Sequence, residues 1–382
     1  MNVSRRTAAG EVDPNDTRNK SQIYITSAGF KNHFSYKKQI QLLVWQIVTP
    51  GSAIVLGGTW RTPVKMGLLE KGFVREMKQD GTFSEVVFNR EYESVWAGSA
   101  VESFFSGDDF DAARELKDAE YSKKDKTPKL DKDSWYVMGV DVGRNGDETI
   151  LTVVKVRPGT KGIGTKHVVL IRTIENMPFD RQAVVIKEEW EKFQPKHVVI
   201  DANGVGFGLV DVLVMPTVDP RTKKVYPPFG LANDDKKIYK DLDVPENPAT
   251  KDTLWMMKAT NEINSEGYTN LLGQMGSRKL KFLVTERDAN ARFKELSTTK
   301  RKSHLYRQEL LSPYMQTSIL KDELMNMTQS ETSQTFKLER MTKAVGKDRV
   351  SSLMYAMYVI KLIEDKDKRR RKRGLSQGMF FN

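Results

Sequence analysis

The sequence contains no cysteine and only four histidines, at positions 33, 167, 197 and 304. The lack of cysteine excludes a disulfide framework, a thiolate nucleophile and Cys-ligated zinc or iron–sulfur sites, and it fits a reducing, intracellular compartment. The histidines are too scattered to suggest a His-rich metal site. No window approaches the roughly 20 consecutive apolar residues of a membrane helix. Residues 1–20 are polar and lack the apolar core of a secretory signal. We therefore expect an intracellular protein without a membrane-embedded part.

The chain of 382 residues is strongly basic. It has 62 Lys and Arg against 50 Asp and Glu, for a formal net charge of +12, with 29% charged and 38% hydrophobic residues. This length predicts two or three domains with a hydrophobic core, and the composition is that of a globular protein. The excess of positive charge favours a polyanionic partner, most simply nucleic acid. A merely basic globular protein remains the alternative at this point.

The charge pattern divides the chain. Residues 119–134 (AEYSKKDKTPKLDKDS) are charged, contain one proline and have almost no apolar side chains, so we interpret them as a linker. They separate a first part, 1–118, from a second part, 135–365, which a basic tail, 366–382, follows. The second part shows apolar strand patterns and helical patterns in the order strand, strand, strand, helix, strand, helix. This order predicts an α/β fold with a mixed sheet flanked by helices.

Three aspartates stand at special places in this order. Asp141 ends the first apolar strand, Asp201 ends the fourth strand, and Asp348 precedes the apolar helix near the C-terminus. Taken singly, Asp141 could be a turn residue, and Asp201 and Asp348 could be helix caps. Together they predict carboxylates that repel one another at one edge of the sheet unless divalent cations bridge them. Oxygen ligands suit Mg²⁺ or Mn²⁺, and two such ions can hydrolyse a phosphodiester.

The sequence around these aspartates resembles the ribonuclease H-like nuclease domain of the large terminase subunit of tailed bacteriophages. The resemblance covers roughly 135–365. It is carried by Tyr-Val-Met-Gly-Val-Asp-Val-Gly-Arg-Asn-Gly-Asp-Glu-Thr (136–149), His-Val-Val-Ile-Asp-Ala-Asn-Gly-Val-Gly (197–206) and Gly-Lys-Asp-Arg-Val-Ser-Ser-Leu-Met-Tyr-Ala (346–356). It implies that Asp141, Asp201 and Asp348 are catalytic metal ligands, and that Asp147 is a further acidic ligand. It also implies two Mg²⁺ or Mn²⁺ ions.

The same resemblance implies a biological setting. The protein would be an endonuclease that cuts concatemeric double-stranded viral DNA in the host cytoplasm during genome packaging, with the portal protein and the small terminase subunit as partners. Two alternatives remain open. One is another ribonuclease H-like nuclease of the resolvase or recombinase type, and the other is a non-catalytic basic DNA-binding subunit of the packaging machinery.

Residues 1–118 resemble the end of the terminase ATPase domain. Ile-Thr-Ser-Ala-Gly (25–29) is similar to the family's coupling motif and gives that role to Thr26 and Ser27; 88–96 with Phe104-Phe105 is similar to the segment that closes that domain. The alternative for 26–29 is an ordinary strand-to-turn junction. The phosphate loop G-x-x-x-x-G-K-[ST] is absent. We therefore expect no ATP hydrolysis by this chain alone, and a nucleotide-binding half that comes from another chain or exon.

Cleavage without base preference requires contacts to DNA phosphates, which Lys and Arg provide. Lys347 and Arg349 flank Asp348, so we expect them to contact the substrate. The residues that we expect to bind DNA are Arg144, Lys300, Arg301, Lys302, Lys347 and Arg349.

Overall fold

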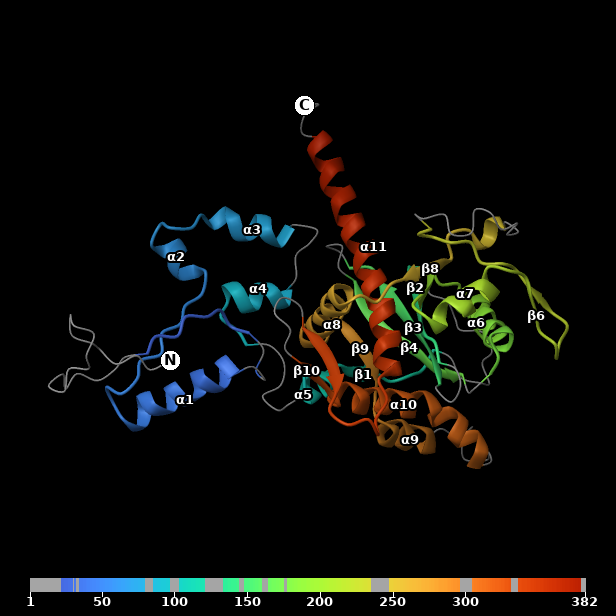
Figure 1. Ribbon diagram of the computed structural model, residues 1–382, viewed down its shortest axis with the longest axis horizontal. Helices are drawn as coiled ribbons and strands as arrows, with labels where there is room; N and C mark the ends of the chain where they lie inside the picture. The colour runs from blue at the N-terminus through green and yellow to red at the C-terminus, as the bar shows by residue number, and fades with distance from the viewer. Residues whose placement is uncertain are drawn as a thin grey trace, which may run out of the picture.

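Figure 1 shows the protein as a computed structural model, with a central sheet on one side and a group of short helices on the other. The structure describes residues 22–29, 31, 34–79, 85–96, 103–120, 133–143, 148–159, 164–174, 177–234, 247–295, 304–330 and 336–378. No helix within these ranges combines the length and the apolar character needed to cross a bilayer.

Among the described residues, seven strands form one mixed sheet in the order β1-β9-β4-β3-β2-β5-β8. Strands β2, β3 and β4 form an antiparallel meander, whereas β5 runs parallel to β2, β8 to β5, β9 to β4 and β1 to β9. The bounds are β1 (Arg114–Leu116), β2 (Trp135–Asp141), β3 (Thr149–Arg157), β4 (Thr165–Ile174), β5 (His197–Asp201), β8 (Leu254–Met257) and β9 (Leu280–Leu283). The predicted mixed α/β sheet is confirmed.

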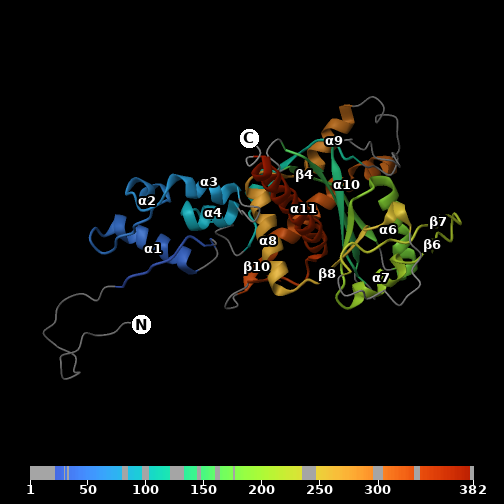
Figure 2. The same cartoon turned by 90° about the horizontal axis from the view of Figure 1, so that it is seen from above.

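Helices cover both faces of this sheet, so its central strands are buried on both sides (Figure 2). Helices α6 (Phe179–Phe193) and α7 (Val205–Leu213) pack on the face to which Tyr136, Met138 and Val140 of β2 point. Helices α8 (Asn261–Gly276), α10 (His304–Met325) and α11 (Asp348–Gly378) pack on the opposite face, to which Val137 points. Side chains alternate between the two faces along a strand, so this assignment places every second residue of β2 towards α11.

Residues 103–118 belong to this body rather than to the segment before it. Helix α5 (Gly107–Ala112) and strand β1 lie at the edge of the sheet, where β1 pairs with β9. Phe105 and Phe110 are fully buried in the core under α8 and α10. The boundary expected after residue 118 therefore does not separate 103–118 from the sheet, because these aromatic side chains complete its core. Of the expected linker, the structure describes only 119–120 and 133–134.

The described residues between 22 and 96 form a separate group of four helices beside α8 (Figures 1 and 2). They also include extended stretches around 22–29 and 53–59 that contain no assigned strand. Many large apolar side chains are exposed here, among them Ile25 at 94% and Leu56 at 89%. The helices are α1 (Phe34–Val48), α2 (Arg61–Lys65), α3 (Lys71–Gln79) and α4 (Glu85–Tyr92).

The remaining elements lie outside the seven-stranded sheet. Strands β6 (Thr217–Val218) and β7 (Val225–Tyr226) form one small hairpin, and β10 (Met327–Ser330) and β11 (Lys337–Arg340) form another. A short 3₁₀ helix (Pro248–Thr250) precedes β8, and α9 (Glu286–Glu295) follows β9.

Candidate functional site

Asp141 is the last residue of β2, and its position in the strand decides which way it faces. Val137, Gly139 and Asp141 follow one another at every second residue, so they share the face that α11 covers. Asp201 ends β5, which runs parallel to β2, and it shares this face with Val199. Parallel strands end at the same edge of a sheet, so the sequence pattern brings both carboxylates to one edge on one face.

Gly139 lets α11 lie unusually close to β2. A Cβ atom at this position would lie 2.0 Å from the backbone oxygen of Ser352, so only glycine fits. The Ser352 hydroxyl, in turn, donates to Gly139 O at 3.1 Å and contacts Thr152 Oγ1 at 2.7 Å. This close contact, less than two helical turns after the start of α11, places Asp348 beside the end of β2.

The turn after β5 fixes Asp201. Gly204 has φ +56°, and a Cβ at Gly206 would lie 1.9 Å from Asp201 O, so the turn requires glycine at both positions. Asp201 Oδ1 accepts from the backbone N–H groups of Asn203 at 3.2 Å and Ala259 at 3.3 Å. The Tyr355 hydroxyl lies 3.5 Å from Asp201 Oδ2. The carboxylate is therefore held from both sides.

The three aspartates affect one another electrostatically. Burial raises the pKa of Asp141 from its usual 3.8 to about 7; the Asp348 carboxylate adds to this shift, Lys347 opposes it, and Asp201 adds to it. Burial also raises the pKa of Asp201, against the N–H donors of Ala259 and Asn203. The structure thus brings Asp141, Asp201 and Asp348 into one region where their negative charge is not fully balanced.

Hydroxyl groups from two helices line this region. Ser351 forms a hydrogen bond with the Asp141 side chain and also contacts Tyr268 and Tyr355. Burial raises the pKa of Tyr268 to about 12, and it raises the pKa of Tyr355 as well, so both stay neutral donors. The sequence motifs around the aspartates did not point to these residues. Ser351 and Tyr355 follow Asp348 at i+3 and i+7, a spacing that indicates one helix face, whereas nothing in the sequence connects Tyr268 to the site.

The two cations beside Asp348 have different surroundings. Lys347 is exposed and close enough to Asp141 to lower its pKa, which fits the expected contact with substrate. Arg349 is only 8% exposed, and its guanidinium is bonded to Glu323, Gln316 and Thr173. We therefore correct the expectation of a DNA contact for Arg349: its donors are already taken up inside the protein.

Several residues expected from the sequence are not placed by the structure. Arg144, Asp147, Lys300, Arg301 and Lys302 lie outside the described residues. Thr26 and Ser27 lie in the extended stretch 22–29, where both are exposed and the Thr26 hydroxyl donates to Ser27 O at 2.8 Å. Their expected role in coupling stays a prediction.

The donor set at the sheet edge fits a hard divalent cation. The three carboxylates of β2, β5 and α11 could provide oxygen ligands, and a cation would relieve their mutual repulsion. Within the part of the chain that the structure describes, no group of three or more His, Cys, Asp or Glu side chains is arranged so that it could hold a metal ion as it stands. Binding would therefore require these side chains to turn towards a shared ion.

The raised pKa of Asp141 predicts that a neutral side chain at this position stabilises the folded protein, by an amount that depends on pH. Between pH 4 and 7 the folded protein retains a proton that the unfolded chain releases, so stability falls as pH rises through this window. At about 1.4 kcal/mol per unit, the shift corresponds to about 4 kcal/mol. Asp141→Asn should raise the Tm of the metal-free protein at pH 8, and by less at pH 5. Thermal unfolding with EDTA checks this, and an equal gain at both pH values would contradict it.

Comparisons with known proteins give matches among solved structures. No family model and no curated protein matches the sequence. The large terminase nuclease of thermophilic phage G20c with bound magnesium is 15% identical, with 68% of this chain and 98% of that chain covered and a TM-score of 0.39. The nuclease domain of the large terminase subunit gp2 of bacterial virus Sf6 is 14% identical, with 66% and 96% covered and a TM-score of 0.35. The HK97 bacteriophage large terminase is 10% identical, with 81% and 55% covered and a TM-score of 0.39.

Proposed function

We propose that this protein is a metal-dependent DNA endonuclease that cuts concatemeric viral DNA during genome packaging, as the nuclease part of a large terminase. The observation that supports this chemistry is the position of Asp141, Asp201 and Asp348 at the ends of β2 and β5 and at the start of α11. Burial and the charges of Asp348 and Asp201 raise the pKa of Asp141 to about 7, although Lys347 opposes this shift. Uncompensated negative charge of this kind is typical of functional sites. The sequence motifs and the basic charge support DNA as substrate.

In this proposal, each residue at the sheet edge has a definite role. Asp141, Asp201 and Asp348, with Asp147 as a further candidate, would hold two Mg²⁺ or Mn²⁺ ions. When bound, such ions supply activation of the attacking water and stabilisation of the leaving oxygen. Asn203 and Ala259 orient Asp201 through their N–H groups, with the Tyr355 hydroxyl on the other side of the carboxylate. The exposed Lys347 holds a substrate phosphate next to Asp141.

A plasmid assay tests this proposal directly. We expect supercoiled DNA to be nicked and linearised by the full chain with Mn²⁺ or Mg²⁺, and to stay intact with excess EDTA. Cleavage that persists in EDTA would contradict a metal-dependent site. DNA binding without cleavage under any of these metals would instead favour a non-catalytic packaging subunit. Strong preference for branched over linear duplex substrates would favour a resolvase-type nuclease.

We further propose that the exposed apolar surface of residues 22–96 is covered in the working protein. Ile23, Ile25, Ile54 and Leu56 lie in extended stretches and are each at least 74% exposed. An apolar surface of this kind fits an interface. Its proposed occupant is the nucleotide-binding domain of a packaging ATPase, and we propose that the portal protein and the small terminase subunit complete the assembly in the host cytoplasm.

A further inference from the structure

Two buried polar side chains, Glu323 in the last turn of α10 and Asn326 directly after this helix, hold the segment that leads into α11. Glu323 is 1% exposed and Asn326 is 5% exposed, and they are three residues apart, so both face the same way. Buried groups of this kind are costly unless their hydrogen bonds are satisfied. Both are satisfied entirely by the segment 341–350, which contains Asp348.

Glu323 caps the start of α11 from outside the helix. Its Oε2 accepts from the backbone N–H groups of Arg349 at 2.9 Å and Val350 at 3.2 Å, and its Oε1 accepts from Arg349 Nη1 at 2.8 Å. The first N–H groups of a helix have no partner inside the helix and attract negative charge. Glu323 thus fixes the two backbone N–H groups that directly follow Asp348 in the first turn of α11.

Asn326 holds the chain just before this turn. Its Oδ1 accepts from Thr342 N at 3.0 Å, and its Nδ2 donates to Thr342 O at 2.9 Å and to Val345 O at 3.4 Å. Its backbone oxygen accepts from Met341 N at 2.8 Å. The segment that leads to Asp348 is therefore held at several points by the residue that directly follows α10.

Arg349 extends the same network to the sheet. Its Nη2 donates to Thr173 Oγ1 at 3.1 Å, at the end of β4, and lies 3.6 Å from Glu148 Oε2, which follows the loop after Asp141. Its Nε donates to Gln316 of α10 at 2.9 Å. The cation next to Asp348 is thereby tied to α10, to β4 and to the chain that returns from Asp141.

We infer that Glu323 is a positioning residue of the site: its carboxylate, with Arg349 and Asn326, sets the place and direction of Asp348 relative to Asp141 and Asp201. This inference rests on the proposed function, because it takes Asp348 as a metal ligand. Glu323 itself accepts hydrogen bonds only within the protein, so its effect on a bound ion is through Asp348. Groups that orient metal ligands are worth about 10- to 100-fold in metal affinity or activity.

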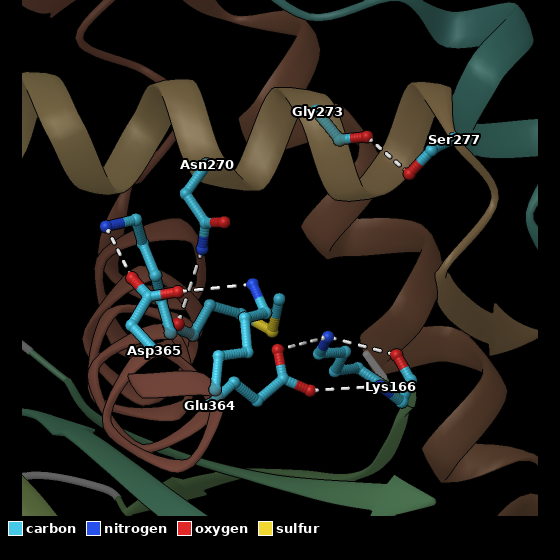
Figure 3. Close-up of polar contacts among 10 residues, drawn as sticks. Lys166, Asn270, Gly273, Ser277, Glu364 and Asp365 are labelled. Carbon is cyan, nitrogen blue, oxygen red and sulfur yellow. Dashed lines mark hydrogen bonds and ion pairs between the residues drawn. The ribbon is translucent and has the colours of Figure 1, made fainter. Parts of the chain in front are cut away.

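A matched control lies near the middle of α11. Figure 3 shows Lys166 of β4 and Glu364 of α11 pointing towards one another. Lys166 Nζ donates to Glu364 Oε2 at 2.8 Å, and Gly164 N donates to Glu364 Oε1 at 3.1 Å. Like Glu323, Glu364 is a buried carboxylate that accepts from one cation and from a backbone N–H group. Its partner Lys166 is at the start of β4, however, whereas Asp141 lies at the opposite edge of the sheet, where β3 begins and β4 ends.

The experiment compares Glu323→Gln with Glu364→Gln in the full chain. Each change removes one negative charge and places the NH2 group of Gln against groups that themselves donate hydrogen bonds. Both variants should therefore have a Tm in EDTA that is lower than wild type by a similar amount. Mn²⁺ alone is then titrated without DNA, with the rise in Tm as the readout, and plasmid cleavage is titrated in parallel. We expect the half-saturating Mn²⁺ concentration to rise about tenfold or more in Glu323→Gln and to stay at the wild-type value in Glu364→Gln.

The outcomes separate this inference from the proposed function. If Glu323→Gln and Glu364→Gln give the same Mn²⁺ midpoint, Glu323 is only a structural cap and the inference is overturned. Asp348→Asn in the same titration tests the site itself: an unchanged Mn²⁺ midpoint there would overturn the proposed metal site. Should Glu323→Gln fail to fold, Asn326→Ala releases the same segment, and it must show the same rise in the Mn²⁺ midpoint for the inference to stand.

Discussion

Asp201→Asn should abolish Mn²⁺-dependent cleavage of plasmid DNA while DNA binding stays nearly unchanged. The substitution keeps the shape of the side chain and its contacts with Asn203 and Ala259, but it removes one anionic ligand. Groups that only orient metal ligands are worth about 10- to 100-fold, so loss of a ligand should cost more than about 100-fold. Affinity for DNA comes from distributed Lys and Arg contacts, which this change does not affect.

Asp252→Asn is the matched control for this prediction. Asp252 is exposed, precedes β8 at the end of the sheet opposite Asp201, and has φ +58°, a conformation that asparagine tolerates. We expect wild-type cleavage from it. Nicking and linearisation with Mn²⁺ are measured beside a binding assay at fixed salt concentration. Equal cleavage by Asp201→Asn and the wild type would remove Asp201 from the active site and, with it, most of the case for a nuclease.

Gly139→Ala should be the most damaging single-methyl change in the sheet. The added Cβ would lie 2.0 Å from Ser352 O and 3.0 Å from Ala356 N, and both are backbone atoms of α11 that no side-chain rotation can move aside. The helix must therefore shift away from β2. Overpacking typically costs about 1–3 kcal/mol and occasionally more, and the backbone contact places this site at or above the upper end.

Thermal unfolding measures this effect, with Gly276→Ala as the control. Gly276 ends α8 in the same body, and a Cβ there would meet only Asp109 Oδ2 at an ordinary 3.8 Å. We expect Gly276→Ala to leave the Tm within a few degrees of wild type and Gly139→Ala to lower it by about 6 °C or more. A Gly139→Ala protein with wild-type Tm and wild-type cleavage would show that α11 does not need its close approach to β2.

Much of the site follows from local sequence patterns. Apolar runs that end in Asp141 and Asp201 predict strands, and alternation along a strand fixes the face of each carboxylate once one neighbour is known to be in the core. The glycines after Asp201 predict a tight turn, because only they tolerate the close contact and the positive φ found there. The order of these elements was enough to predict the mixed sheet that the structure confirms.

Other features were decided only when distant segments packed together. The sequence places Arg349 beside Asp348 like any exposed cation, but packing of α10 buries it against Glu323, 26 residues earlier in the chain. Likewise, Phe105 and Phe110 precede the charged stretch that suggested a boundary, yet they complete the core of the sheet that follows it. Strand and helix patterns depend on neighbours in the sequence, so the sequence determined them. Whether a charge contacts solvent or a buried partner depends on which surfaces meet in three dimensions, and only the tertiary structure decided that.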